Sequence, residues 1–405
     1  MSAIPILQVP ASPVSVLITI SFILIIGYIA REIFRKTKIP EVLILILIGL
    51  VLVPIGHVLP SDYVVTLRSL AQLFGAIALI TIMYGGGKKI GLTSSFMNFK
   101  GMSLGILDVL VPAVLVAYAM NLLLGWPLIY GGLLGIMFGA TASAIVIPII
   151  RGLKMPSEIY EMLIVETALS SVVSIVLFTV MLSMLAGHVF SIQSFVEYVV
   201  DYLSVAVFVG ILAGFLWLVA LSRIKAADEY LAKLAIAILV YGIVSLLNGA
   251  AIVSVLIFAM MMGNYRPISK LIKLNIRISR NTARQEIEVG SALEFLIRTF
   301  FFVFIGMIAL LSYSYLEYAL IVTVLLVLAR FVEVKLALWK SKQYQTLTFS
   351  MMQRGTVVAV LATLLYSMGG SYFNQIFYIS FMVIIATNII GSILVSRVKF
   401  EVKPD

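Results

Sequence analysis

The chain has 405 residues, of which 62% are hydrophobic and only 11% charged. One soluble core cannot bury so much apolar surface, so we expect an all-α integral membrane protein whose main partner is the lipid bilayer. The formal net charge of +10 would suggest nucleic acid in a soluble protein, but the Lys and Arg residues lie in short loops between hydrophobic runs. We therefore expect no nucleic acid partner.

Hydrophobic runs between polar clusters predict about 13 transmembrane helices of roughly 20 residues each. In chain order we place them at residues 14–30, 40–59, 69–87, 102–124, 128–150, 160–186, 202–222, 230–246, 249–263, 291–311, 318–335, 347–368 and 373–395.

Basic residues follow the odd-numbered predicted spans and are nearly missing from the even-numbered loops. They include Arg31, Arg35, Lys36 and Lys38, then Lys88, Lys89 and Lys100, then Arg151 and Lys154, the cluster from Arg266 to Arg284, and Lys340 and Lys342. Because positively charged loops stay in the cytoplasm, this alternation predicts a multi-pass protein of the cell membrane. Its N-terminus would lie outside and its C-terminus in the cytoplasm.

The predicted spans form one transmembrane domain over residues 1–405. Its parts are a first group of spans at 14–263, a cytoplasmic interfacial linker at 264–290, the last spans at 291–395 and a short cytoplasmic tail at 396–405. In the linker, apolar residues interleave with basic ones, which favours a helix lying on the membrane surface over residues 264–289. A solvated loop is the alternative.

Two predicted spans are interrupted by polar residues. The span at 128–150 contains several glycines, then Thr141, Ala142 and Ser143, and finally Pro148. These glycines either weaken the helix or allow close packing against another helix. The span at 347–368 contains a Gln-Arg-Gly-Thr run that ends at Thr356. The two spans are an odd number of spans apart and cross in opposite directions, which is typical of inverted repeats whose broken helices meet at a binding site.

Charged residues inside predicted spans need a partner or a function, because each costs about 2.5 to 3.5 kcal/mol at the bilayer centre. They are Asp108, Glu166, Arg298, Arg330, Glu333 and Arg354. Asp108 either pairs with a basic residue or titrates during transport. Arg330 and Glu333 are three positions apart and could partly satisfy each other, although Glu333 is also near Lys335 at the membrane surface.

Glu166 begins a polar stripe, because Thr167, Ser170 and Ser171 follow it at helical spacing. The stripe either packs against a neighbouring helix, with Glu166 in a buried ion pair, or lines an ion path. The complete set of ion-path candidates is Asp108, Thr141, Ser143, Glu166, Thr167, Ser170 and Ser171.

Four segments carry a family resemblance. They are Phe138-Gly139-Ala140-Thr141-Ala142-Ser143-Ala144-Ile145-Val146, Glu166-Thr167-Ala168-Leu169, Phe300-Phe301-Phe302-Val303-Phe304-Ile305-Gly306-Met307 and Arg354-Gly355-Thr356-Val357. In this order they resemble the monovalent cation/proton antiporter superfamily, which includes archaeal sodium/proton exchangers and the membrane domain of potassium efflux antiporters. The resemblance covers nearly the whole chain.

The resemblance implies an inverted-repeat antiporter fold with two discontinuous crossing helices, usually in a homodimer, that exchanges a monovalent cation for protons by a rocking movement. It implies a structural ion pair between Glu166 and Arg354, and an arginine at Arg330 that offsets the dipoles of the broken helices. The expected ligands of a sodium or potassium ion are Thr141, Glu166, Thr167 and Ser171.

The chain departs from the family at Ser170 and Ser171, where typical members have Asn-Asp or Gln-Asp. That aspartate binds the cation and exchanges it for protons. Ala142 also stands where some members have a second aspartate. Hydroxyl groups and backbone carbonyls suit a hard cation, but they do not titrate.

Three interpretations follow from this departure. The chain is an antiporter with impaired exchange, or it moves a cation with Glu166 or Asp108 as the proton carrier, or it carries an anion or organic acid on the same fold.

We expect neither enzymatic activity nor a cofactor. The sequence has no His-Glu-x-x-His pattern, no catalytic aspartate pair and no serine with a usable histidine. The absence of cysteine excludes disulfides, thiolate metal sites and cysteine nucleophiles. Neither a repeated filter nor a ring of charges is present, which disfavours a channel.

Overall fold

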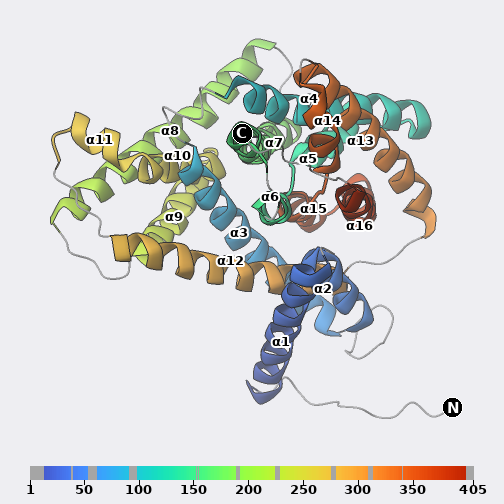
Figure 1. Cartoon of the computed structure of the whole chain (residues 1–405), viewed down its shortest axis with the longest axis horizontal. Coiled ribbons are helices and arrows are strands. Elements are labelled where there is room, and N and C mark those ends of the chain that lie inside the picture. Colours follow the sequence, from blue (N-terminus) through green and yellow to red (C-terminus); the bar gives the residue numbers. More distant parts are fainter. Residues whose placement is uncertain are drawn as a thin grey trace.

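A computed structural model describes residues 13–37, 40–52, 62–90, 98–151, 153, 155–187, 192–223, 229–274, 280–308, 313–339 and 341–397. Within these ranges the chain is helical apart from short turns and two extended breaks (Figure 1). The predicted all-α fold is therefore confirmed.

Up to residue 263, the described part of the chain contains ten helices. They are α1 (Pro13–Thr37), α2 (Glu41–Leu50), α3 (Asp62–Lys89), α4 (Phe99–Leu124), α5 (Leu128–Gly139), α6 (Ser143–Arg151), α7 (Ser157–Gly187), α8 (Ile192–Arg223), α9 (Glu229–Leu246) and α10 (Ala251–Gly263). The remaining described helices are α11 (Tyr265–Leu271), α12 (Arg280–Ile308), α13 (Leu316–Ala337), α14 (Lys342–Ser350), α15 (Thr356–Met368) and α16 (Ser371–Arg397), and the 3-10 turn η3 (Tyr313–Tyr315) precedes α13.

Every predicted span overlaps at least one of these helices. In the described part of the chain, five helices are long and apolar enough to cross a membrane alone: α4, α7, α8, α12 and α16. The bent pair of α10 and α11 would make a sixth, and several shorter apolar helices of 10–17 residues accompany them. The count of about 13 spans stays a prediction.

The linker differs from the predicted interfacial helix. Its helical part, α11, is only 7 residues long and bends by 77° from the axis of α10. Lys273 follows with a positive φ of 56°, which ends the helix there. From Arg280 onward the chain belongs to α12, and residues 275–279 lie outside the described part. A single helix over 264–289 is therefore wrong.

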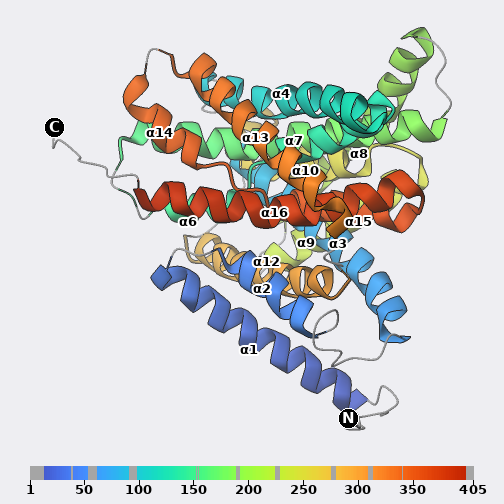
Figure 2. The same cartoon turned by 90° about the vertical axis from the view of Figure 1, so that its right-hand side faces the viewer.

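Both predicted interruptions are present. α5 ends at Gly139 and α6 begins at Ser143, and α14 ends at Ser350 while α15 begins at Thr356. Figure 1 shows α6 and α15 near the middle of the molecule, between α8–α11 on one side and α4, α13, α14 and α16 on the other. α7 and α16 run in roughly the same direction across the molecule (Figure 2). The breaks therefore lie inside the bundle.

The glycines of α5 allow close packing against α4. A Cβ atom on Gly135 would lie 2.4 Å from the carbonyl oxygen of Pro112, and one on Gly139 would lie 2.5 Å from Cα of Val109. Neither separation is sterically possible, so only glycine permits this approach of the two helices. Because α5 is helical through Gly139, the glycines serve packing rather than weaken the helix.

Candidate functional site

The two breaks cross each other as extended segments. The amide of Ala142 donates to the carbonyl of Gln353 at 2.9 Å, and Thr141 forms an isolated antiparallel bridge with Arg354. Backbone groups that cannot bond within a helix are thus satisfied by the other break. The crossing brings the ends of four short helices, α5, α6, α14 and α15, to one place in the core.

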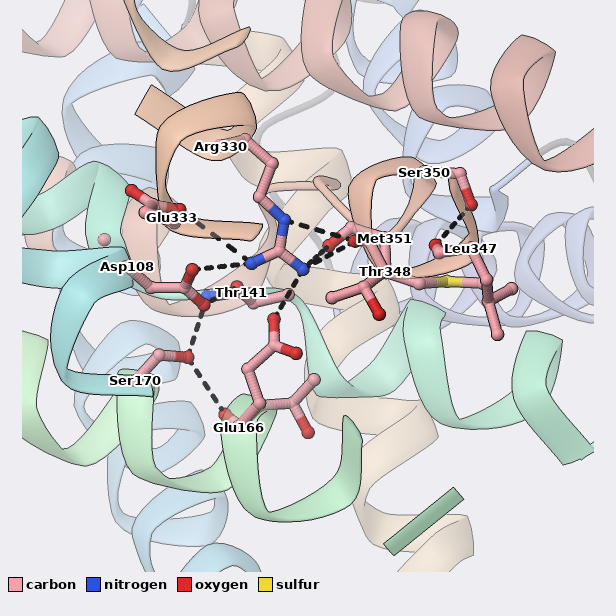
Figure 3. A network of polar contacts seen from close by, with 12 residues as sticks. Asp108, Thr141, Glu166, Ser170, Arg330, Glu333, Leu347, Thr348, Ser350 and Met351 are labelled. Atoms are coloured by element: carbon pink, nitrogen blue, oxygen red, sulfur yellow. Dashed lines mark hydrogen bonds and ion pairs between the residues drawn. The ribbon is translucent and has the colours of Figure 1, made fainter. Parts of the chain in front are cut away.

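Arg330 on α13 is the centre of the polar network beside this crossing (Figure 3). Its Nη1 atom lies 2.5 Å from Oδ1 of Asp108 on α4, and its Nη2 atom lies 2.6 Å from Oε1 of Glu166 on α7. Glu333, one turn further along α13, approaches Nη1 at 3.9 Å. A planar guanidinium with five N–H donors can serve several carboxylates at once, as it does here.

Arg330 also lies at the carboxyl end of a broken helix. Its Nε and Nη2 atoms donate to the carbonyl of Thr348 at 3.2 and 2.7 Å, and Nη2 donates to the carbonyl of Met351 at 3.2 Å. These carbonyls belong to the last turn of α14 and to the residue after it. A positive charge is favourable there because the carboxyl end of a helix carries partial negative charge.

The partner expected for Glu166 is wrong. Glu166 pairs with Arg330, whereas Nη1 of Arg354 donates to the carbonyl of Gly139 at 3.1 Å and to Oγ1 of Thr141 at 3.2 Å. Gly139 is the last residue of α5, so Arg354 stabilises the carboxyl end of that helix. Each of the two arginines therefore serves one broken helix, and among the described residues Glu166 pairs with Arg330.

Asp108 is fully buried and takes part in two kinds of contact. Besides its ion pair with Arg330, its Oδ2 atom accepts a hydrogen bond of 3.1 Å from Oγ1 of Thr141. Thr141 lies in the first break, so Asp108 connects α4 both to α13 and to the crossing. The sequence left pairing and titration open for Asp108, and the structure shows the pairing.

The polar stripe of α7 faces the first break. The amide of Thr141 donates to Oγ of Ser170 at 3.3 Å, and Oγ of Ser171 donates to the carbonyls of Thr141 at 3.4 Å and Thr167 at 2.9 Å. Oγ1 of Thr167 donates to the carbonyl of Ile164 at 3.1 Å. These hydroxyl oxygens keep lone pairs free to accept a further bond or to ligate a cation.

A cavity of about 710 Å³ reaches this stripe. Ser143, Thr167, Ser171 and Thr356 are among the polar residues that line it near the crossing, and Arg31, Glu41, Lys88, Glu294 and Arg298 line it where α1, α2, α3 and α12 meet. Glu41 and Arg298 form an ion pair there. Of the predicted ion-path residues, Ser143, Thr167 and Ser171 thus line a cavity, while Asp108 and Glu166 lie behind it around Arg330.

Two polar residues of the site were not assigned to it from the sequence. Asn388 on α16 is fully buried, and its side-chain amide donates to the carbonyl of Arg354 at 2.6 Å. An amide inside an otherwise apolar span was the available signal. Glu333 was expected either to satisfy Arg330 in part or to lie near Lys335 at the membrane surface. It is fully buried, while the exposed Lys335 donates to Gln345 at 2.9 Å.

The charges of the site do not balance. Asp108, Glu166 and Glu333 are buried together with Arg330 and Arg354, and none of the five is more than 1% exposed. Three carboxylates beside two guanidinium groups would carry one net negative charge. Since an uncompensated buried charge is very unfavourable, the site requires one additional proton or one monovalent cation.

A helical membrane protein in which two broken helices cross at a buried cluster of charges is a secondary transporter in architecture. Residues 20–400 match the family model described as "Sodium/hydrogen exchanger, transmembrane". The chain belongs to this family of sodium/hydrogen exchangers. The family and the multi-pass membrane character predicted from the sequence are thus confirmed, and a transporter family agrees with the expectation of no enzymatic activity.

Three comparisons with proteins of Methanocaldococcus jannaschii illustrate the similarity. Over 166 residues the chain is 26% identical to Na(+)/H(+) antiporter 1 of Methanocaldococcus jannaschii; this stretch is 40% of the chain and spans 38% of the relative's length. The solved structure of the sodium proton antiporter MjNhaP1 from that organism at pH 8 is similar with a TM-score of 0.76 and 21% identity, over 95% of this chain and 98% of that one. An electron-microscopy structure of MjNhaP1 is similar with a TM-score of 0.75 and 22% identity, over 97% of this chain and 100% of that one.

The predicted antiporter fold is confirmed by this structural similarity. Neither impaired exchange nor the alternative of an anion or organic-acid carrier receives support from these relatives.

Proposed function

We propose that the chain exchanges sodium for protons across the cell membrane by alternating access. The observation that carries the proposal is the buried cluster of three carboxyl and two guanidinium groups at the crossing of the broken helices. Family membership supports it. A site with one net negative charge is neutral with either one proton or one sodium ion, and this competition is what couples two ions that move in opposite directions.

The cation would enter the cavity and stop at its polar end near the crossing. Thr167 and Ser171 on α7, Ser143 at the start of α6 and Thr356 at the start of α15 offer hydroxyl oxygens there. Oxygen ligands suit a hard cation such as sodium or potassium. In this arrangement Glu166 and Asp108 act through their charge, because both are already held by Arg330.

The cavity would open to the cytoplasm. Arg31 and Lys88 line it, and both follow odd-numbered predicted spans whose loops the positive-inside rule assigns to the cytoplasm. The structure then corresponds to an inward-open state, with the N-terminus outside and the C-terminus in the cytoplasm. Transport would require the crossing helices to move against α1–α3 and α8–α12. A homodimer is proposed from the family resemblance alone.

Sodium-driven proton flux in proteoliposomes tests this function. We expect flux with the natural sequence when a sodium gradient is imposed, and none with a choline gradient of the same ionic strength. Potassium in place of sodium decides which cation is carried. Absence of flux with both cations would contradict the proposal.

Ser171 provides the matched variant. Ser171→Ala removes a hydroxyl group at the cavity. The control, Ser183→Ala, removes a hydroxyl group from the same helix. Both hydroxyl groups donate to the carbonyl four residues before, at 2.9 Å for Ser171 and 2.8 Å for Ser183. We expect only Ser171→Ala to raise the half-saturating sodium concentration, by about tenfold or 1.4 kcal/mol. Ser171→Asp adds a titratable group and is expected to shift the pH range of flux. Flux seen only with Ser171→Asp would show that exchange is impaired in the natural sequence.

A further inference from the structure

Glu333 differs from the other two carboxyl groups of the site. Asp108 and Glu166 each lie within 2.6 Å of Arg330, whereas Glu333 comes no nearer than 3.9 Å. The side chain of Glu333 is fully buried, and neither of its oxygen atoms has a hydrogen-bond donor among the described residues. An ionised carboxylate without a hydrogen bond is very unfavourable at this depth. Glu333 therefore either holds a proton or needs a further positive charge beside it.

Neighbouring groups favour the proton. The Glu333 and Asp108 carboxyl groups both approach Nη1 of Arg330, at 3.9 and 2.5 Å, and the Glu166 carboxyl group approaches Nη2 at 2.6 Å. Adjacent carboxylates repel each other when both are ionised, so one of them stays protonated. Because Asp108 and Glu166 are already paired with Arg330 as carboxylates, Glu333 is the group left to hold the proton.

Besides Glu333, the charged groups of the site lie on four segments of the chain. Asp108 lies on α4, Glu166 on α7 and Arg330 on α13, and Arg354 precedes α15. α14 and α16 also pack against α13. α14 has Lys342 at its first position and α16 has Arg397 at its last, and both helices are otherwise uncharged. In the described part of the chain, the balance around Glu333 is therefore set by the five charged groups of the site.

We propose that Glu333 is the proton-carrying residue of this exchanger. The proposal rests on the sodium/proton exchange proposed above and names the group that exchange requires. Ser171, which lines the cavity, cannot release a proton in the physiological range. The sequence-based candidates Glu166 and Asp108 would act as fixed charges, since each is tied to Arg330 by a short ion pair.

Contacts lead from Glu333 toward the cavity. Glu333 and Asp108 both approach Nη1 of Arg330, at 3.9 and 2.5 Å, Asp108 accepts from the hydroxyl of Thr141, and the carbonyl of Thr141 accepts from Ser171 at the cavity wall. When sodium arrives at the hydroxyl groups, its charge makes ionisation of Glu333 favourable. The O–H bond of the Glu333 carboxyl group breaks, and water in the cavity takes up the proton. The net charge of the site is the same before and after.

Proton release on sodium binding tests the proposal in weakly buffered detergent solution. We expect about one proton per bound sodium from the natural protein and from Glu317→Gln. Glu317 is an exposed carboxylate in the first turn of the same helix, so it controls for a change of charge on α13. Glu333→Gln is expected to release none while keeping its thermal midpoint, because glutamine has the shape of the protonated acid. Release from Glu333→Gln equal to that of the natural protein would overturn the proposal.

Infrared difference spectroscopy keeps the test decisive if Glu333→Gln does not fold or no longer binds sodium. Sodium should remove a protonated carboxyl band from the natural protein, and Glu333→Asp should shift the frequency of that band. A band that Glu333→Asp leaves unchanged assigns the proton elsewhere and refutes this role for Glu333. If the natural protein shows neither proton release nor proton flux, the proposed exchange itself is refuted. If the natural protein shows flux but Glu333→Asp leaves the carboxyl band unaltered, only the role of Glu333 is refuted.

Discussion

Arg330 and Asp108 join α13 to α4 through a 2.5 Å ion pair between residues that are 222 positions apart in the sequence. Both side chains are fully buried. The pair fixes the distance between the two helices that flank the crossing, and through Thr141 it also fixes the first break. Stability and ion binding therefore depend on the same contact.

Asp108→Asn should destabilise the protein strongly. It removes one carboxylate from Arg330 without removing the arginine, and loss of one partner of a buried ion pair costs about 3 to 5 kcal/mol. The matched control is Glu158→Gln, which breaks the 2.9 Å ion pair with Lys100 at side chains that are 65% and 42% exposed; such a pair contributes at most about 1 kcal/mol. Thermal unfolding in detergent measures both, and equal shifts of the midpoint would contradict the assignment of a tightly coupled pair.

Asn388→Ala should impair exchange as well as stability. The Asn388 amide donates to the carbonyl of Arg354 at 2.6 Å and to that of Ile384, four residues before it, at 2.8 Å. Without it, a buried carbonyl of the second break lacks a donor, at a cost of about 1 to 3 kcal/mol.

Asn264→Ala is the control for Asn388→Ala. Asn264 is also buried, and it likewise donates to a distant carbonyl, that of Ile90, and to the carbonyl four residues before it, both at 2.8 Å. We expect comparable losses of thermal stability in the two variants. Flux in proteoliposomes should fall only for Asn388→Ala, and an equal fall in Asn264→Ala would show that the effect is general.

Gly135→Ala should destabilise the contact between α4 and α5. The new methyl group would meet the backbone of Pro112 and Ala113 at 2.4 to 2.8 Å, and overpacking of this kind costs about 1 to 3 kcal/mol. Gly242→Ala on α9 is the opposite case, because a Cβ atom there meets nothing within 4 Å. Alanine should stabilise that helix by up to about 1 kcal/mol. Unfolding midpoints that move in the same direction would refute the packing assigned to Gly135.

Single cysteines can test the cavity and its orientation together, because the natural sequence has none. Ser143→Cys places a thiol in the cavity wall, whereas Ser174→Cys places one at a fully buried position on α7 whose hydroxyl group donates to Ile136. A membrane-impermeant maleimide should label Ser143→Cys from the cytoplasmic side and leave Ser174→Cys unlabelled. Labelling of Ser143→Cys only from outside would reverse the proposed orientation.

The sequence was sufficient for the features that have a local signal. Polar residues within apolar runs located both breaks, because neither Thr141-Ala142-Ser143 nor Gln353-Arg354-Gly355-Thr356 is a favourable helix interior in a membrane. Helical spacing placed Thr167, Ser170 and Ser171 on one face of α7. In each case the chemistry of neighbouring residues was enough.

Pairing across the bundle could not be predicted in the same way. Arg330 and Arg354 are both deep in the membrane, and hydropathy gives the depth of a residue but not its lateral position, so the partner of Glu166 was assigned wrongly. For Glu333 a signal did exist. A residue three positions after Arg330 shares its buried face, whereas Lys335, five positions after it, faces outward. The position of Glu333 around the helix axis, rather than its closeness to Lys335 in the sequence, therefore decides its burial.

The site takes its charges from residues that are far apart in the chain, and this has a consequence for biosynthesis. Asp108 and Glu166 leave the ribosome long before Arg330, which is 222 residues after the first of them. Until α13 has been inserted, we expect the two acids to remain protonated or close to water, since each would otherwise cost about 2.5 to 3.5 kcal/mol in lipid. The contacts of Asp108 and Glu166 with Arg330 can therefore form only after α13 has been made, late in translation.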